Sequence, residues 1–108
     1  MNSNPSLPDA KKARALAIAT TIHTVCRHFE VDPAHVLTSH TKKKHPDHNA
    51  RRIIYHHLHS CGMHKMQIAR IFGRSQTSVH DGLRYAHFNL IDRHRLLLEK
   101  LPKIPEKP

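Results

Sequence analysis

The side chains with the most informative chemistry stand together near position 75. Ser75-Gln76-Thr77 follows Gly73 and precedes a stretch of periodic apolar residues, which is the pattern of a helix N-terminus. A Gln side chain can pair with adenine through two hydrogen bonds, and a Thr methyl group can contact the methyl group of thymine. His80 follows one turn later on the same helix. We therefore expect Ser75, Gln76, Thr77 and His80 to contact base edges in the major groove of DNA.

The small and apolar residues around this segment have the spacing of a helix-turn-helix. Ala69 allows a second helix to pass close by, and Gly73, four residues later, suits a turn that needs a positive φ. Val79 is expected to fill the angle between the two helices. Ile68, Phe72 and Leu83 are expected to fill the rest of the contact between the two helices. Ser75 or its neighbour is expected to cap the second helix. An ordinary helical hairpin in an all-α core is the alternative.

The charge of the chain favours DNA binding over a purely structural hairpin. The 108 residues contain 18 Lys and Arg against 8 Asp and Glu, a net charge of +10 with His neutral. Such a balance favours a polyanionic partner, either nucleic acid or an anionic surface. Between Lys42 and Arg84, nine Lys and Arg accompany only two Asp, so most of the excess surrounds the motif. Phosphate contacts are expected from Lys42, Lys43, Lys44, Arg51, Lys65, Arg74, Ser78 and Arg84.

The elements that must position these residues are predicted to be helices almost throughout. Gly is scarce, and no segment alternates between apolar and polar residues with a period of two. The predicted helices span about 9–30, 33–37, 47–60, 64–72 and 75–101. Asp9 is expected to cap the first helix, and Asp32 followed by Pro33 is expected to start the second. We predict an all-α domain of about five helices at 9–101, a flexible N-terminus at 1–8 and a disordered, proline-rich tail at 102–108.

Two adjacent arginines, Arg51 and Arg52, lie near the start of the predicted third helix. Consecutive helical residues point about 100° apart, so at most one of the two can face a DNA groove. Arg51 shares the apolar side of the helix with Ile54 and Leu58, whereas Arg52 shares a more polar side with His59. Arg52 is therefore the better candidate for contacting bases, and Arg51 for contacting a phosphate.

Residues 18–86 resemble the C-terminal DNA-binding domain of the DnaA replication initiator family, which has a Trp-repressor-like fold. Val31-Asp32-Pro33 with Val36-Leu37 is similar to the family's entry into a short second helix, and Thr41-Lys42-Lys43-Lys44 falls where the family has a basic loop. Arg51-Arg52-Ile53-Ile54-Tyr55 resembles its Arg-led helix. The segment QIARIFG at 67–73 resembles its first motif helix, and RSQTSVH at 74–80 its signature turn and recognition helix.

The resemblance implies sequence-specific binding to double-stranded DNA in replication or transcription control. The residues themselves indicate no enzymatic activity, cofactor or nucleotide, because the sequence has no phosphate-binding loop and no carboxylate pair suited to catalysis. The resemblance also implies that Arg51 or Arg52 enters the minor groove. Ser75 and Gln76 replace an acidic residue and a His of the family signature, while Thr77 and Ser78 agree with it. We therefore expect the architecture to carry over and the recognised DNA sequence to differ. A binding domain without the ATPase module, of the kind that phages or mobile elements carry, is implied.

Thirteen histidines raise an alternative function, a His-rich metal-binding or metal-sensing protein. His57, His59, Cys61 and His64 are candidate ligands, because imidazole and thiolate groups suit zinc or copper. They lack the paired spacing of a known metal site, so we assign no metal ligands. We expect most histidines to lie near phosphates and gain charge as the pH falls, and His57 to be a packed ring.

Several other functions are disfavoured by the sequence. No apolar run approaches 18 residues, so no membrane span is expected. Three Gly are too few for a phosphate-binding loop, and no pair of carboxylates suggests acid–base catalysis. Cys26 and Cys61 suggest reduced thiols in a cytoplasmic protein. The expected DNA binding would make that protein nucleoid-associated. For the last helix two interpretations stay open: a homodimer through Leu90, Leu97 and Leu101, or packing against the first helix.

Overall fold

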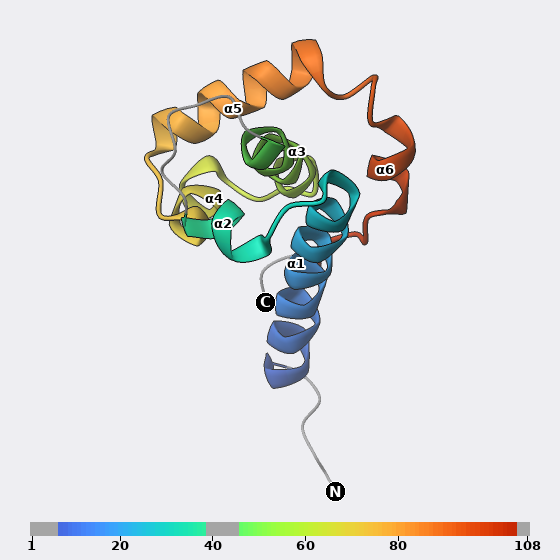
Figure 1. Cartoon of the computed structure of the whole chain (residues 1–108). Coiled ribbons are helices and arrows are strands. Elements are labelled where there is room, and N and C mark those ends of the chain that lie inside the picture. Colours follow the sequence, from blue (N-terminus) through green and yellow to red (C-terminus); the bar gives the residue numbers. More distant parts are fainter. Residues whose placement is uncertain (1–6, 39–45, 106–108) are drawn as a thin grey trace, which may run out of the picture.

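The fold was obtained as a computed structural model, which describes residues 7–38 and 46–105 (Figure 1). Within those two ranges the secondary structure consists of six α-helices without a β-strand. The helices are α1 (Leu7–Phe29), α2 (Pro33–Thr38), α3 (Pro46–Ser60), α4 (Lys65–Phe72), α5 (Gln76–Asn89) and α6 (Arg95–Lys100). The predicted all-α class is confirmed. None of the described helices is long and apolar enough to cross a membrane.

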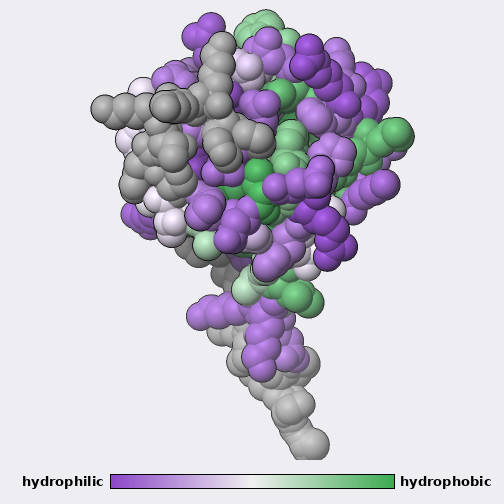
Figure 2. Space-filling model, viewed as in Figure 1, coloured by the Kyte–Doolittle hydropathy of each residue, from purple (hydrophilic) through white to green (hydrophobic). Residues whose placement is uncertain are grey.

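Helix α3 forms the centre of the fold. It contacts α1, α2, α4 and α5, and Figure 1 shows α5 crossing over it. Ile53, Ile54 and Leu58 are fully buried, so the apolar side of α3 supplies much of the core. The N-terminal half of α1 extends away from this body (Figure 1). On the face drawn in Figure 2, hydrophilic side chains cover most of the body and hydrophobic ones form smaller patches.

Local signals set most helix ends. Asp32 Oδ1 accepts a hydrogen bond from the backbone N–H of Ala34 at 2.9 Å, and Pro33 is the first residue of α2, as predicted. The expected cap at Asp9 is wrong, because α1 begins at Leu7 and places Asp9 in its first turn. A carboxylate there still favours the helix through the helix dipole.

The prediction of one long helix at 75–101 is wrong. Helix α5 ends at Asn89, a turn follows, and α6 begins at Arg95. A straight helix would carry its last leucines past the core, whereas the break at Leu90 returns them to it. Leu90, Leu97 and Leu101 are consequently at most 8% exposed within one chain. These three side chains pack within one chain, whereas Phe88 and Leu96 of the same segment are exposed. A homodimer through the last helix stays a prediction.

The C-terminal segment packs against the body as far as Pro105. Ile104 is 2% exposed, and the carbonyl oxygen of Pro102 lies 2.6 Å from His57 Nε2. Arg14 Nη1 donates to the carbonyl oxygen of Pro105 at 2.7 Å, which ties this segment to α1. The prediction that the chain is disordered from residue 102 is therefore wrong for residues 102–105. There the side chain of Ile104 is buried, and the carbonyl groups of Pro102 and Pro105 contact His57 and Arg14. Residues 1–6 and 106–108 of the predicted flexible ends lie outside the described residues.

Candidate nucleic-acid interface

A tight turn joins α4 to α5. Gly73 adopts φ 60° and ψ 37°, the left-handed conformation that the sequence pattern predicted. The backbone N–H of Gly73 donates to the carbonyl oxygen of Arg70, and the N–H of Arg74 donates to the carbonyl oxygen of Ala69 at 2.9 Å. These two bonds end α4 and reverse the chain direction. Ser75 then caps α5, because its Oγ accepts from the N–H of Ser78 at 3.1 Å, also as predicted.

The residues expected between α4 and α5 are buried there. Val79 and Ile68 are fully buried, Phe72 is 1% exposed and Ala69 is 6% exposed. Leu83 is partly buried against the same core. These contacts fix the orientation of α5 relative to α4, which in turn fixes where the outward face of α5 points.

The outward face of α5 carries five of the residues that were predicted to contact DNA. Gln76, Thr77, His80 and Arg84 are exposed, as is Ser78. Ser75 is exposed too, but its hydroxyl group caps the helix and donates to Ser78 Oγ at 3.0 Å. Gln76 and Thr77 therefore offer the more accessible groups at the start of the helix.

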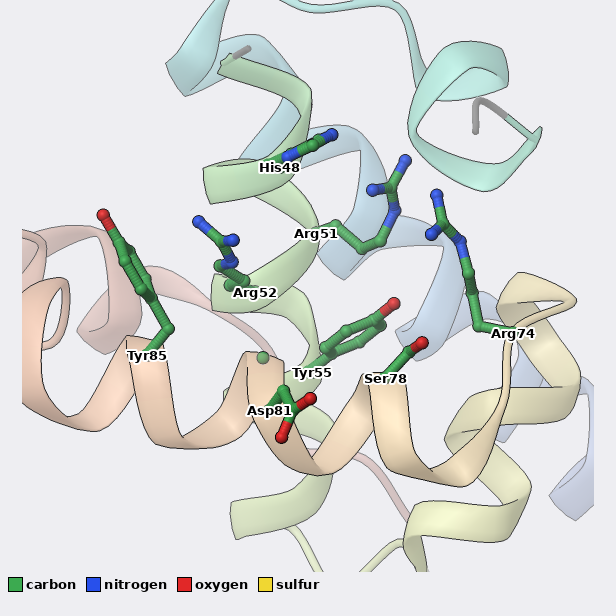
Figure 3. A pocket seen from close by; sticks show the side chains of 9 residues that line it. His48, Arg51, Arg52, Tyr55, Arg74, Ser78, Asp81 and Tyr85 are labelled. Atoms are coloured by element: carbon green, nitrogen blue, oxygen red, sulfur yellow. The ribbon is translucent and has the colours of Figure 1, made fainter. Parts of the chain in front are cut away.

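A basic pocket, which we call the arginine pocket, lies beside this face between α3 and α5 (Figure 3). Its volume is about 360 Å³. Its lining residues are His48, Arg51, Arg52, Tyr55, Arg74, Ser78, Asp81, Gly82 and Tyr85. Among the described lining residues, three guanidinium groups thus accompany one carboxylate, that of Asp81. Such an excess of positive charge can hold an anionic group.

Arg51 forms part of the pocket wall. It is 5% exposed, and its Nε donates to the carbonyl oxygen of Val36 at 2.9 Å, which links α3 to α2. Burial, followed by the positive charge of Arg74, lowers the pKa of Arg51. Figure 3 shows the side chains of Arg51 and Arg74 side by side along the pocket. Arg51 can therefore reach a phosphate only inside this pocket.

Arg52 lines the same pocket from a more exposed position on α3, in agreement with the more polar side that its periodicity predicted. It is less buried than Arg51, and its Nη1 donates to Asn49 Oδ1 at 3.2 Å. Its guanidinium carbon lies 3.9 Å from the centre of the Tyr85 ring, a cation–π contact between α3 and α5. Sequence analysis did not single out Tyr85. The residue stands three positions after Gly82 and so lies on the same side of the helix, which is the signal that could have indicated it.

Gly82 allows α3 and α5 to approach closely. A Cβ atom at this position would lie 2.7 Å from Tyr55 Cδ2, closer than such atoms can come. Tyr55 cannot easily move, because it is 3% exposed and packs edge-on against Phe72 with 5.0 Å between ring centres. The missing side chain of Gly82 therefore brings Tyr85 within reach of Arg52.

The structure describes two of the remaining residues that were predicted to contact phosphates, Lys65 and Arg84. Lys65, at the start of α4, lies with its Nζ 2.9 Å from His80 Nδ1 on α5. Arg84 is exposed two turns into α5. The Lys42-Lys43-Lys44 segment lies outside the described residues.

The candidate metal ligands do not converge. His57 is 8% exposed and packs against the C-terminal segment, as expected of a packed ring, with Cys61 Sγ 3.7 Å from its Nε2. Among the described residues, no group of three or more His, Cys, Asp or Glu side chains is arranged to hold a metal ion. Cys26 is buried, and that burial raises the pKa of its thiol to about 11.

Comparison with known proteins gives no relative from which a function could be transferred. No protein-family model, curated protein or solved structure matches this chain. The resemblance to the DnaA family is therefore an expectation from sequence motifs.

Proposed function

We propose that this chain is a sequence-specific double-stranded DNA-binding protein that uses α4 and α5 as a helix-turn-helix. One observation carries the proposal: the exposed polar start of α5 stands directly beside the arginine pocket. A recognition helix needs base-reading side chains at its N-terminal end and cationic groups next to it for the phosphate backbone. Both kinds of group occur here on helices that pack against one core.

The division of roles follows from exposure. Gln76 and Thr77 are exposed in the first turn of α5 and would contact base edges, with His80 one turn further on. Arg74 and Ser78 line the arginine pocket and would face a backbone phosphate together with Arg51. Arg52 would reach the adjacent minor groove, the role implied by the resemblance to the DnaA family.

The biological setting is part of the same proposal. The resemblance to replication initiators favours origin-like DNA sites, with a role in replication or transcription control. Such a protein would act on the nucleoid in the cytoplasm. A dimer through the last helix would have to use Leu96, because Leu97 and Leu101 are buried within one chain.

The salt dependence of binding to a labelled duplex tests this function. If about five phosphates are contacted, log K should fall against log salt with a slope of about −4 to −5, because bound phosphates release their counterions. Arg74→Ala should make the slope less steep by about one. Arg95→Ala is the matched control, since Arg95 is exposed on α6 and pairs there with Asp92 at 2.9 Å. A wild-type slope near zero contradicts the proposal.

A further inference from the structure

A second groove runs between α3 and α5, next to the start of α4. Its volume is about 330 Å³, and it is lined by His56, His59, Lys65, His80, Leu83, Arg84, His87 and Phe88. We call it the histidine groove. Its polar residues come from three helices, α3, α4 and α5.

The histidine groove and the arginine pocket lie on opposite flanks of α5. At 100° per residue, Ser78 and Tyr85 point to one side of the helix, whereas His80 and His87 point to the other. The exposed face with Thr77 and Arg84 lies between them. A helix in the major groove has one DNA strand on each side, so each flank of α5 would face a different phosphate backbone.

All the ionisable side chains that line the groove are basic. Helix α3 contributes His56 and His59, α4 contributes Lys65, and α5 contributes Arg84 together with two histidines. No Asp or Glu is among these described lining residues. The groove therefore has two permanent positive charges and four imidazoles that can add more.

Lys65 on α4 contacts His80 on α5 across the groove. A lysine ammonium group can only donate hydrogen bonds, so His80 Nδ1, 2.9 Å away, is the acceptor in this contact. Deeper in the groove, burial and the nearby His57, His59 and His87 lower the pKa of His56. Within the groove, the charged form of His56 is therefore disfavoured. A phosphate group would reverse this preference, because its negative charge stabilises protonated histidine.

We propose that the histidine groove is a second phosphate-binding surface, for the DNA strand opposite the arginine pocket, and that it takes up protons when DNA binds. The inference rests on the proposed DNA-binding function and adds to it a pH-dependent contact. Because the complex would hold more protons than the free protein and DNA, affinity should rise as the pH falls. Uptake of about one proton corresponds to about five- to tenfold tighter binding at pH 6.5 than at pH 7.5.

The test measures duplex affinity at pH 6.5 and 7.5 at constant salt, and counts protons by calorimetry in two buffers that differ in ionisation enthalpy. The wild type is compared with the double variant His80→Gln/His87→Gln, which removes the imidazole in contact with Lys65. Both side chains are exposed, so the substitutions should not disturb folding. The control is His23→Gln, at an exposed position of α1 away from both flanks of α5.

We expect the wild type and His23→Gln to take up about one proton, and the double variant to lose most of this uptake and of the pH dependence. Measurable DNA binding with no proton uptake by the wild type would overturn the inference and leave the proposed function standing. The same conclusion follows if the double variant keeps the full pH dependence. Absence of duplex binding at either pH would instead overturn the proposed function.

Discussion

The guanidinium carbon of Arg52 lies 3.9 Å from the centre of the Tyr85 ring, so the first half of α3 is joined to the middle of α5 by a cation–π contact. The Asn49 amide oxygen holds the same guanidinium group from α3 itself, at 3.2 Å. Arg52 therefore has a defined direction before any DNA arrives. A preorganised side chain loses less entropy on binding, which suits a residue that is to enter a narrow groove.

Replacing the two adjacent arginines should give different results. Arg52→Ala should weaken binding about five- to tenfold and remove any preference for A·T-rich flanks, because a narrow A·T minor groove attracts arginine. Arg51→Ala should lower affinity with flank preference intact. It should also lower the melting temperature, since Arg51 is 5% exposed and bonds to Val36. Affinity on duplexes with A·T-rich and G·C-rich flanks, together with thermal unfolding, separates the two. Unchanged flank preference in both variants would assign the pair to phosphates alone.

Gln76 and Lys43 should differ in what their loss does to specificity. Gln76→Ala should cost ~1–3 kcal/mol on the preferred site and little on other sequences, because a paired base contact is lost. Lys43→Ala should weaken binding to all sequences alike and make the salt slope less steep by about one. Titrations of a preferred and a scrambled duplex at several salt concentrations measure both effects. Identical behaviour of the two variants would mean that α5 is not the recognition helix.

Gly82→Ala should destabilise the fold although alanine is the better helix former. The added Cβ would lie 2.7 Å from Tyr55 Cδ2, in a position where the ring is 3% exposed. We expect a loss of ~1–3 kcal/mol in the free energy of unfolding, measured with urea. Arg84→Ala on the exposed side of the same helix is the control and should change stability little. Equal stability of Gly82→Ala and the wild type would show that α3 and α5 are not in close contact.

The packed C-terminal segment can be tested through Ile104. Ile104→Ala should reduce the free energy of unfolding by ~2–4 kcal/mol, because a side chain that is 2% exposed leaves a cavity. Lys103→Ala, at the exposed neighbouring position, should have little effect. Urea unfolding of both variants decides the matter. An equal, small effect at both positions would mean that the segment does not pack as described.

Local chemistry made much of the fold predictable. The Asp32-Pro33 start of α2, the left-handed Gly73 and the Ser75 cap each depend on a few neighbouring residues, and all three were correctly predicted. The break after Asn89 was not, because leucines at helical spacing fit one long helix as well as two shorter ones. Burial of Ile104 was also missed, since a proline-rich segment has no periodicity that indicates packing.

The candidate site was predictable in part for the same reason. The outward face of α5 follows from the helical period, and so does the burial of Arg51 relative to Arg52. The meeting of Arg52 with Tyr85, and the two flanks of α5, depend on how closely α3 and α5 approach. That distance is set by Gly82 against Tyr55, a tertiary contact that no local pattern specifies.

Selection of bound sites from a pool of random duplexes tests the central claim most directly. The protein should enrich one short motif, and the Gln76→Ala variant should lose selectivity at one base pair of that motif while keeping the others. Direct readout by the first turn of α5 predicts this result. Recovery of DNA without any enriched motif, or the same motif with equal selectivity for the variant, would contradict sequence-specific recognition through α5.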